Sequence, residues 1–100
     1  MSQKAKSPRV MPHNNEAEQS ILCSILIDEN ASVMVFATLK SEDFYSEVHE
    51  IIFDSMLDLY NANIPIDFVT LTEDLNKKAQ LDTVGGYEYI TRLTDVVASS

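Results

Sequence analysis

Apolar residues recur at intervals of three and four along most of the chain, and this spacing places them on one face of an α-helix. Nowhere does an alternation of apolar and polar residues persist over the length of a strand. The sequence therefore predicts an all-α fold, a compact bundle of about five to six short helices. The expected helices are Glu16–Ile27, Ala31–Leu39, Ser46–Tyr60 and Phe68–Lys78, a fifth with Tyr87, Ile90 and Leu93 at spacing three, and a sixth that opens at Val96.

Residues that start or stop helices stand at the ends of these segments. Asn15, with Glu18 three residues later, resembles a capping box at the start of the first helix. Asp67 is placed to cap the fourth helix, and Pro65 prevents the third helix from continuing into it. Bulky core anchors are expected at Phe44, Phe53 and Phe68.

The third expected helix has the widest apolar surface. At ~100° per residue its apolar residues cover an arc of about 240°, more than one core-facing stripe needs. We therefore expect this helix to be central or to meet a second molecule. The candidate dimer or partner surface consists of Phe53, Met56, Leu57 and Tyr60. The remaining arc carries Glu47, Glu50, Asp54 and Asp58, a stripe that is a solvated face or an acidic docking surface for a basic partner.

Charge divides the chain into two parts. Of the 100 residues, 16 are acidic and seven basic, a net charge of −9. Residues 1–13 hold three of the bases, two prolines and no acid, and are expected to form a flexible basic arm. Residues 14–100 then carry sixteen acids and four bases, a net charge of −12. Such a domain repels phosphate, so DNA is not expected to be its direct ligand.

Further composition argues for a cytoplasmic protein with no membrane contact. The longest apolar run, residues 21–27, is far shorter than the ~20 residues that a membrane span needs. The single cysteine, Cys23, cannot form an intrachain disulfide and is expected to be a buried structural thiol.

No catalytic, cofactor-binding or metal-binding residues are predicted. His49-Glu50 opens the HExxH pattern of zinc proteases, but Phe53 stands where the second histidine is required. His49 is therefore expected at the surface or at the edge of its helix. Gly85-Gly86 is expected to stop one helix and start the next, because Tyr87 follows where a phosphate-binding loop has lysine.

Four segments occur in the order and register of a known family. They are Met11-Pro12-His13-Asn14-Asn15-Glu16-Ala17-Glu18-Gln19-Ser20, Ser41-Glu42-Asp43-Phe44-Tyr45, Pro65-Ile66-Asp67-Phe68-Val69-Thr70-Leu71 and Val84-Gly85-Gly86-Tyr87-Glu88-Tyr89-Ile90. Together they resemble the amino-terminal domain of bacterial replicative DNA helicases of the DnaB type. The resemblance covers about residues 11–93.

The resemblance implies an assembly and docking domain of a hexameric helicase that acts in DNA replication. It implies self-association as a trimer of dimers in a collar, recruitment of primase and contact with a helicase loader. ATP, Mg²⁺ and DNA would be bound by the ATPase domain, which is absent from these residues, so the fragment itself would not be an enzyme.

Three alternatives stay open at this point. The first is the helicase-binding carboxyl-terminal domain of primase, which has a related helical fold. The Pro65–Leu71 segment and the start at Met1 favour the helicase. The second is an unrelated all-α protein-interaction module, and the third a small helical enzyme or metal protein.

Overall fold

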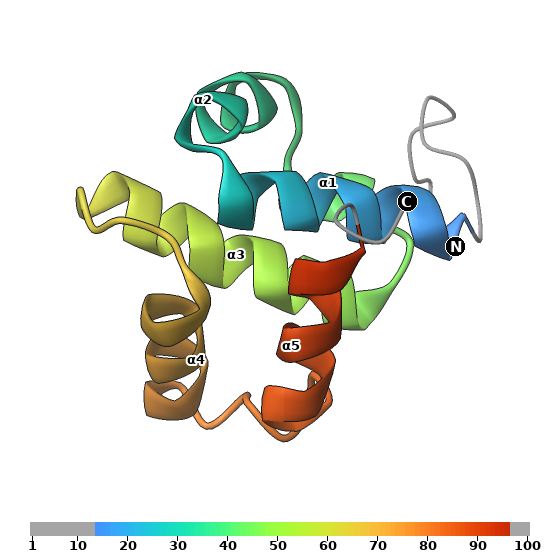
Figure 1. The fold of residues 1–100 in the computed structure, drawn as a ribbon, viewed down its shortest axis with the longest axis vertical. Coiled ribbons are helices and arrows are strands. Elements are labelled where there is room, and N and C mark those ends of the chain that lie inside the picture. Colours follow the sequence, from blue (N-terminus) through green and yellow to red (C-terminus); the bar gives the residue numbers. More distant parts are fainter. Residues whose placement is uncertain (1–13, 97–100) are drawn as a thin grey trace.

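The computed structural model describes residues 14–96, and these form five α-helices and one short 3-10 helix (Figure 1). The order is α1 (Asn15–Ile27), α2 (Glu29–Thr38), η1 (Ser41–Asp43), α3 (Glu47–Asn61), α4 (Phe68–Lys77) and α5 (Gly86–Asp95). The all-α prediction and the expected number of helices are confirmed within this range. The expected basic arm lies outside the described residues, as does the expected sixth helix beyond Val96.

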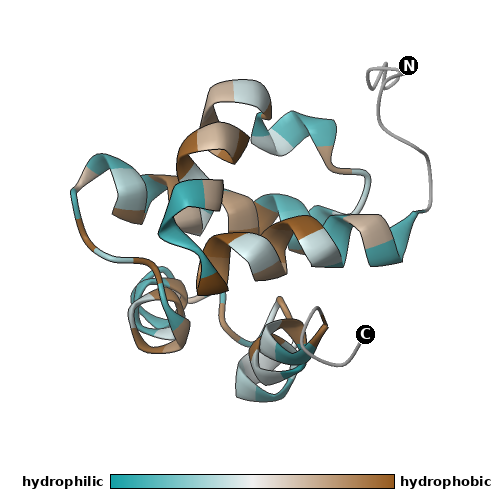
Figure 2. Ribbon diagram, turned by 45° about the horizontal axis from the view of Figure 1, so that its top comes forward, coloured by the Kyte–Doolittle hydropathy of each residue, from teal (hydrophilic) through white to brown (hydrophobic). Residues whose placement is uncertain are grey.

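Helices α1 and α3 form the centre of the bundle. Helix α2 packs on α1, α4 packs on α3, and α5 contacts both α1 and α4 (Figure 1). In Figure 2 brown, hydrophobic stretches alternate with teal, hydrophilic stretches along the helices. The core side chains are Leu22, Ile25, Phe44, Ile52, Phe53, Met56, Leu59, Leu71, Leu75, Leu81, Val84, Ile90 and Leu93.

Aromatic rings fill the space beside α3. The Phe53 ring lies 5.2 Å from that of Phe36 on α2 and 5.0 Å from that of Phe44, which follows η1. Phe44 and Phe53 are buried, as expected, whereas Phe68 is half-buried. Cys23 is also buried, and this confirms its predicted place in the interior.

The first two helices begin one or two residues earlier than predicted. The Asn14 side chain, not that of Asn15, accepts the hydrogen bond from Ala17 N at 3.0 Å that caps α1. Asp28 ends α1 and also caps α2, because its side chain accepts from Asn30 N at 3.0 Å. A single residue therefore serves two helices, and it alone separates them, where the predicted helices left a gap of three residues.

The third helix ends before Pro65, at a turn that the helix-stopping effect of Pro65 does not predict. Asn63 has a φ of 61°, Ile64 N donates to Leu59 O at 2.9 Å, and Asn63 N donates to Tyr60 O at 3.1 Å. This hydrogen-bond pattern is a Schellman motif with asparagine at its left-handed position. Helix α4 ends in the same way, with Ala79 at φ 59° and Gln80 N bonded to Leu75 O.

Gly85 sets the start of α5. Its φ is 108°, and a Cβ atom at this position would lie 2.7 Å from the Cβ of Tyr89. The predicted start of a helix here is therefore confirmed, and only glycine fits it. The predicted stop is wrong, because α4 already ends at Lys77. Ile90 and Leu93 face the core, but Tyr87 is 57% exposed, and Tyr89 packs against the core from this helix instead.

Candidate functional site

A polar cluster in the interior links three helices. Glu18 Oε1 on α1 lies 2.7 Å from His49 Nδ1 on α3, and His49 Nε2 lies 2.6 Å from the Tyr89 hydroxyl on α5. The side-chain amide of Gln19 donates to the same hydroxyl at 3.0 Å. A carboxylate only accepts hydrogen bonds, so the ring donates from Nδ1 to Glu18. Nε2 and the Tyr89 hydroxyl form the second hydrogen bond of the ring.

The expectation that His49 lies at the surface is wrong, because only 1% of the residue is exposed. The surface position was predicted because no second metal ligand follows His49 on its own helix. That spacing does not show which residues of other helices contact His49. Those helices supply Glu18 and Tyr89, which lie 31 and 40 positions away in the sequence. A buried imidazole needs a partner at both nitrogens, and these two residues provide them.

Glu18 does not act in a capping box, and that prediction is also wrong. Its carboxylate accepts from Tyr45 N at 2.6 Å and from Ser46 N at 3.4 Å, in addition to His49. Only 4% of Glu18 is exposed, and such a buried carboxylate is tolerated because several donors surround it. Glu18 therefore holds the chain in place directly before α3, where Ser46 is the N-cap.

The cluster fixes the positions of helices relative to one another. Both ring nitrogens of His49 form hydrogen bonds within the protein, and the Tyr89 hydroxyl also accepts a hydrogen bond from Gln19. Within residues 14–96 no group of three potential ligands is placed to hold a metal ion. The cluster joins α1, α3 and α5, and it presents no free base or nucleophile to a substrate.

The predicted partner surface on α3 is only partly accessible. Phe53 and Met56 are fully buried, so their prediction as surface residues is wrong. Helices α1 and α4 and the 3-10 helix η1 pack against α3, and Ile52 and Leu59 of its apolar arc are also buried. Leu57 is half-buried and Tyr60 is 37% exposed, so a partner role for these two residues remains a prediction.

The acidic stripe on α3 faces outward over most of its length. Glu47, Asp54 and Asp58 are exposed, and Glu50 is half-buried. Its role as a docking surface remains a prediction. Asp58 is already paired with Lys78, which limits its availability to a partner.

Lys78 lies between two carboxylates and ties α4 to α3. Its Nζ atom binds Asp58 and lies 2.8 Å from Asp74 Oδ2, which also accepts from Ser55 Oγ at 2.5 Å. Burial alone would raise the pKa of Asp74. The hydrogen bonds from Lys78 and Ser55 outweigh that effect and, with the charges of Lys78 and Lys77, hold this pKa below its ordinary value. Burial alone would lower the pKa of Lys78, and the two carboxylates raise it above its ordinary value.

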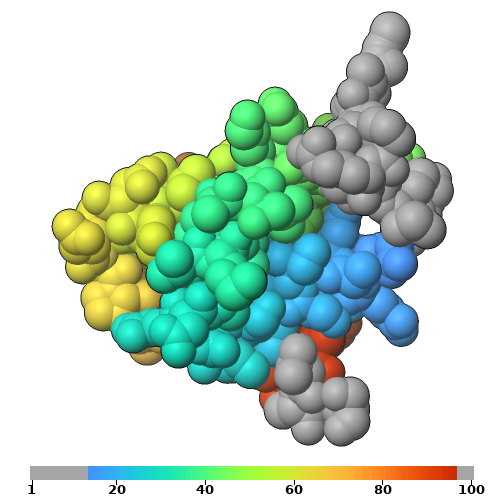
Figure 3. Space-filling view, turned by 90° about the horizontal axis from the view of Figure 1, so that it is seen from above, coloured from blue at the N-terminus to red at the C-terminus, as the bar shows by residue number. Residues whose placement is uncertain are grey.

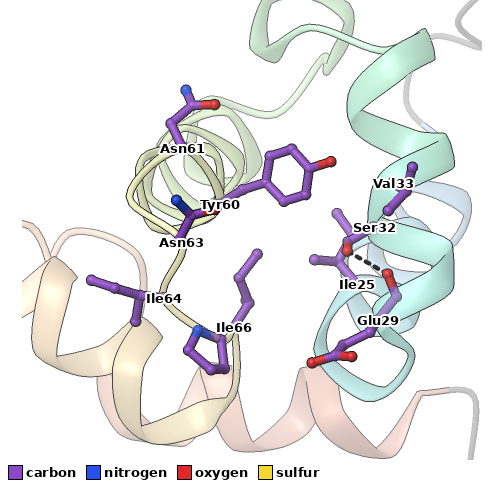
Figure 4. Close-up of a pocket in the computed structure, with 10 residues that line it drawn as sticks. Ile25, Glu29, Ser32, Val33, Tyr60, Asn61, Asn63, Ile64 and Ile66 are labelled. Atoms are coloured by element: carbon purple, nitrogen blue, oxygen red, sulfur yellow. Dashed lines mark hydrogen bonds between the residues drawn. The ribbon is translucent and has the colours of Figure 1, made fainter.

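A groove of about 520 Å³ lies between α2 and the segment that joins α3 to α4 (Figure 4). The Tyr60 ring and the Ile66 side chain point into it from one side, and Ile25 and Val33 lie on the other. Figure 3 shows α2 (teal) beside the segment around residue 60 (yellow) on the same face. The lining residues are Ile25, Glu29, Ser32, Val33, Tyr60, Asn61, Asn63, Ile64, Pro65 and Ile66.

The sequence pattern does not predict this groove. Val33 and Met34 contributed to the apolar pattern that predicted the second helix, yet they are 55% and 72% exposed. Val35, Phe36 and Leu39 pack against the core in their place. The sequence does indicate that some of these residues are exposed, because apolar residues occur on nearly every side of this short helix and the core can cover only one side.

The fold and its surface define a class of protein. Residues 14–96 form a small all-α domain whose polar cluster is internal and whose apolar groove and acidic stripe are accessible from outside. No helix within this range is long and apolar enough to cross a membrane. These features are those of a protein-interaction domain.

The chain belongs to the DnaB-like helicase N terminal domain family, whose model matches residues 10–100. It is 38% identical over 96 residues to the replicative DNA helicase DnaB of Leifsonia xyli, and 37% identical over 94 residues to that of Geobacillus stearothermophilus. These matches cover 95% and 94% of this chain. The family resemblance drawn from the four sequence segments is confirmed, and the helicase is favoured over the primase domain.

A solved structure agrees with the same assignment. The crystal structure of the N-terminal domain of DnaB helicase from Mycobacterium tuberculosis matches with a TM-score of 0.82 and 34% identity. The match covers 85% of this chain and 59% of that chain. The present chain spans 21% of the length of the two curated relatives, so it corresponds to only one part of such proteins.

Proposed function

We propose that this chain is the assembly and docking domain of a hexameric replicative DNA helicase. The observation that carries the proposal is the family match over residues 10–100, together with relatives named replicative DNA helicase. The whole protein would couple ATP hydrolysis, with Mg²⁺, to DNA unwinding in the cytoplasm. That chemistry would belong to the part of the relatives that this chain does not span.

The surface of the domain supports docking to proteins. Residues 14–96 include all sixteen acids and four bases, and such a surface repels the phosphate backbone. The domain would therefore contact DNA only through the rest of the parent protein. A basic protein partner, by contrast, would be attracted to the acidic stripe.

Two kinds of partner follow from this proposal. Copies of the domain would pair in the collar of the hexamer, with Leu57 and Tyr60 as candidate contacts because they are the accessible part of the predicted surface. Primase would dock on the acidic stripe, where Glu47 and Asp54 are exposed, and a helicase loader would also bind this domain.

The stripe can be tested by binding primase from the same organism to the purified chain. Reversing one exposed charge, Asp54→Lys, is expected to weaken binding by severalfold and to reduce its dependence on salt. Glu88→Lys is the matched control, because Glu88 is an exposed acid on α5, away from the stripe. Equal effects of the two variants, or no primase binding, would contradict docking on the stripe.

The helicase assignment needs the parent protein. The full-length product should hydrolyse ATP and unwind forked DNA, and the 100-residue chain alone should do neither. Sedimentation equilibrium of the chain over a hundredfold concentration range tests pairing, for which a two-fold dimer is expected. ATP turnover that stays with the rigorously purified chain would refute the proposal.

A further inference from the structure

Helix α2 contributes no residue to the buried apolar core of the described range. The core side chains come from α1, α3, α4, α5 and the segments that connect the helices. Of the ten residues of α2 only Ser32 is buried, and its hydroxyl donates to Glu29 O on the same helix at 2.7 Å. Val35, Phe36 and Leu39 attach the helix to the core, and each is only half-buried. Helix α2 therefore buries little apolar surface, and its packing adds little to the stability of the domain.

The polar contacts of α2 are local. The Asp28 side chain accepts from Asn30 N at 3.0 Å, and the Thr38 hydroxyl donates to Met34 O at 2.8 Å. Within the described range no hydrogen bond or ion pair joins a side chain of α2 to another helix. Detaching α2 would therefore leave no buried polar group without its partner, and the opening would cost mainly the three half-buried apolar contacts.

The aromatic ring of Phe36 covers part of the predicted partner surface on α3. It lies 5.2 Å from the ring of Phe53 and 4.7 Å from the ring of Tyr60, measured between ring centroids. Both residues belong to that predicted surface. Removal of α2 would expose more of Tyr60 and one side of Phe53, next to the half-buried Leu57. Exposed aromatic surface of this kind favours contact with a second molecule.

We propose that α2 is a detachable cover, which opens as a separate unit and exposes Phe53 and Tyr60 for pairing with a second copy of the domain. The inference rests on the pairing proposed above, in which Tyr60 is a candidate contact. The other helices keep their core contacts when α2 leaves, so the opening requires much less than global unfolding. The apparent affinity of pairing then rises with the fraction of molecules in which α2 is open.

Amide hydrogen exchange of the 100-residue chain tests the opening. A helix of ten residues is marginal in water without tertiary contacts, so α2 unfolds and exchanges when it detaches. After correction for intrinsic rates, its amides should exchange about tenfold or more faster than those of α3. Urea well below the unfolding midpoint should accelerate exchange in α3 more than in α2, because opening α2 exposes little surface. Equal rates with equal urea dependence would overturn the proposal.

A core substitution far from α2 gives a second test of separate opening. Ile90 on α5 is fully buried, and Ile90→Val should accelerate exchange in α3 by about two- to tenfold through a loss of global stability. The exchange of α2 should stay unchanged, because its opening leaves α5 in place. Equal acceleration in both helices would mean that α2 opens only when the whole domain unfolds, and would overturn the proposal.

Substitution of Phe36 tests the link to pairing. Phe36→Ala should accelerate exchange in α2 and tighten pairing by up to about tenfold in sedimentation equilibrium, because more molecules are open. Met34→Ala is the matched control, since Met34 is on the same helix with 72% of its area exposed, and it should change neither quantity by more than about twofold. Weaker pairing of Phe36→Ala would overturn the proposal, because the ring would then belong to the interface. Far-UV circular dichroism verifies that each variant is folded.

Protein concentration separates this inference from the proposed pairing. A dimer that selects the open state must increase its population, so exchange in α2 should become faster as the dimer forms. Slower exchange in the dimer would overturn the proposal, because pairing would then hold α2 closed. A chain that stays monomeric at every concentration would refute the pairing itself. The exchange of that monomer would still show whether α2 opens separately, so the two failures are distinguishable.

Discussion

Replacing Glu18 with alanine removes the acceptor at the centre of the buried polar cluster. The Glu18 carboxylate receives a hydrogen bond from His49 at 2.7 Å and from the backbone N–H groups of Tyr45 and Ser46 at 2.6 and 3.4 Å. All three donors would lose this partner in Glu18→Ala. The variant should therefore loosen the start of α3 as well as its contact with α1.

The structure sets the size of the expected effect. A hydrogen bond to a charged group contributes about 1.5–3 kcal/mol, and a buried donor left unpaired costs about 1–3 kcal/mol. Two of the three contacts are short, which gives a loss of about 3–5 kcal/mol. A cavity of about 470 Å³ lined by Glu18, Tyr45 and Ser46 would admit water that replaces part of this bonding. We therefore expect a loss near the lower limit, about 3 kcal/mol.

Denaturant unfolding at neutral pH, followed by far-UV circular dichroism, measures this loss. For a domain of this size about 3 kcal/mol corresponds to a decrease in Tm of about 12–24 °C. Glu16→Ala is the matched control, because Glu16 is an exposed acid on the same helix and loses only its interaction with the helix dipole, about 0.3–1 kcal/mol. If the two variants differ by less than about 1 kcal/mol, Glu18 does not hold the start of α3.

Three further predictions concern the core, the turns and the pH dependence. Phe53→Ala should cost about 3–5 kcal/mol in unfolding free energy, because the ring is fully buried, and an unchanged Tm would refute its place in the core. Gly85→Ala should lower the unfolding free energy by about 2–4 kcal/mol, because of the positive φ at this position and the contact with Tyr89. Ala79→Gly, at φ 59°, should raise it by about 0.5 kcal/mol. Changes in Tm of the same sign in the two variants would contradict these backbone conformations. The pKa of Asp74 is lower in the folded state than in the unfolded state. Its carboxylate therefore stabilises the fold at a pH above its ordinary pKa, and this contribution is lost as the pH falls through the folded-state pKa. Asp74→Asn should make the unfolding free energy depend less on pH below about pH 4, and identical pH profiles of the two proteins would exclude this role.

Helix positions were predictable because their signals are local. Asp67 caps α4 with Thr70, three residues away, and Ser46 caps α3, so both starts could be placed from neighbouring residues. Asn63 carries an equally local signal, since asparagine favours the left-handed position of a Schellman turn, but the sequence also contains Pro65, which predicts a stop two residues later. The error in the start of α1 has the same origin, because Asn14 and Asn15 are both good caps and only the backbone distinguishes them.

The burial of the predicted site residues was less predictable. The wide apolar arc of α3 indicated correctly that the helix is central, but the sequence offered no means of deciding which part of the arc other helices cover. Phe53 and Met56 lie under those helices and Tyr60 does not. Helical periodicity states which side chains share a face, and packing determines whether that face is closed internally.

The sequence by itself determined the helical class, the approximate helix positions, the excess of acids in residues 14–100 and the family, because these depend on composition, short-range spacing and motifs read in order. Only the tertiary structure decided that His49 is buried between Glu18 and Tyr89, and that Val33 and Ile64 line the same groove. These pairs are about 30 to 40 positions apart in the chain. Such contacts depend on how whole helices cross, and no interval between neighbouring residues records that geometry.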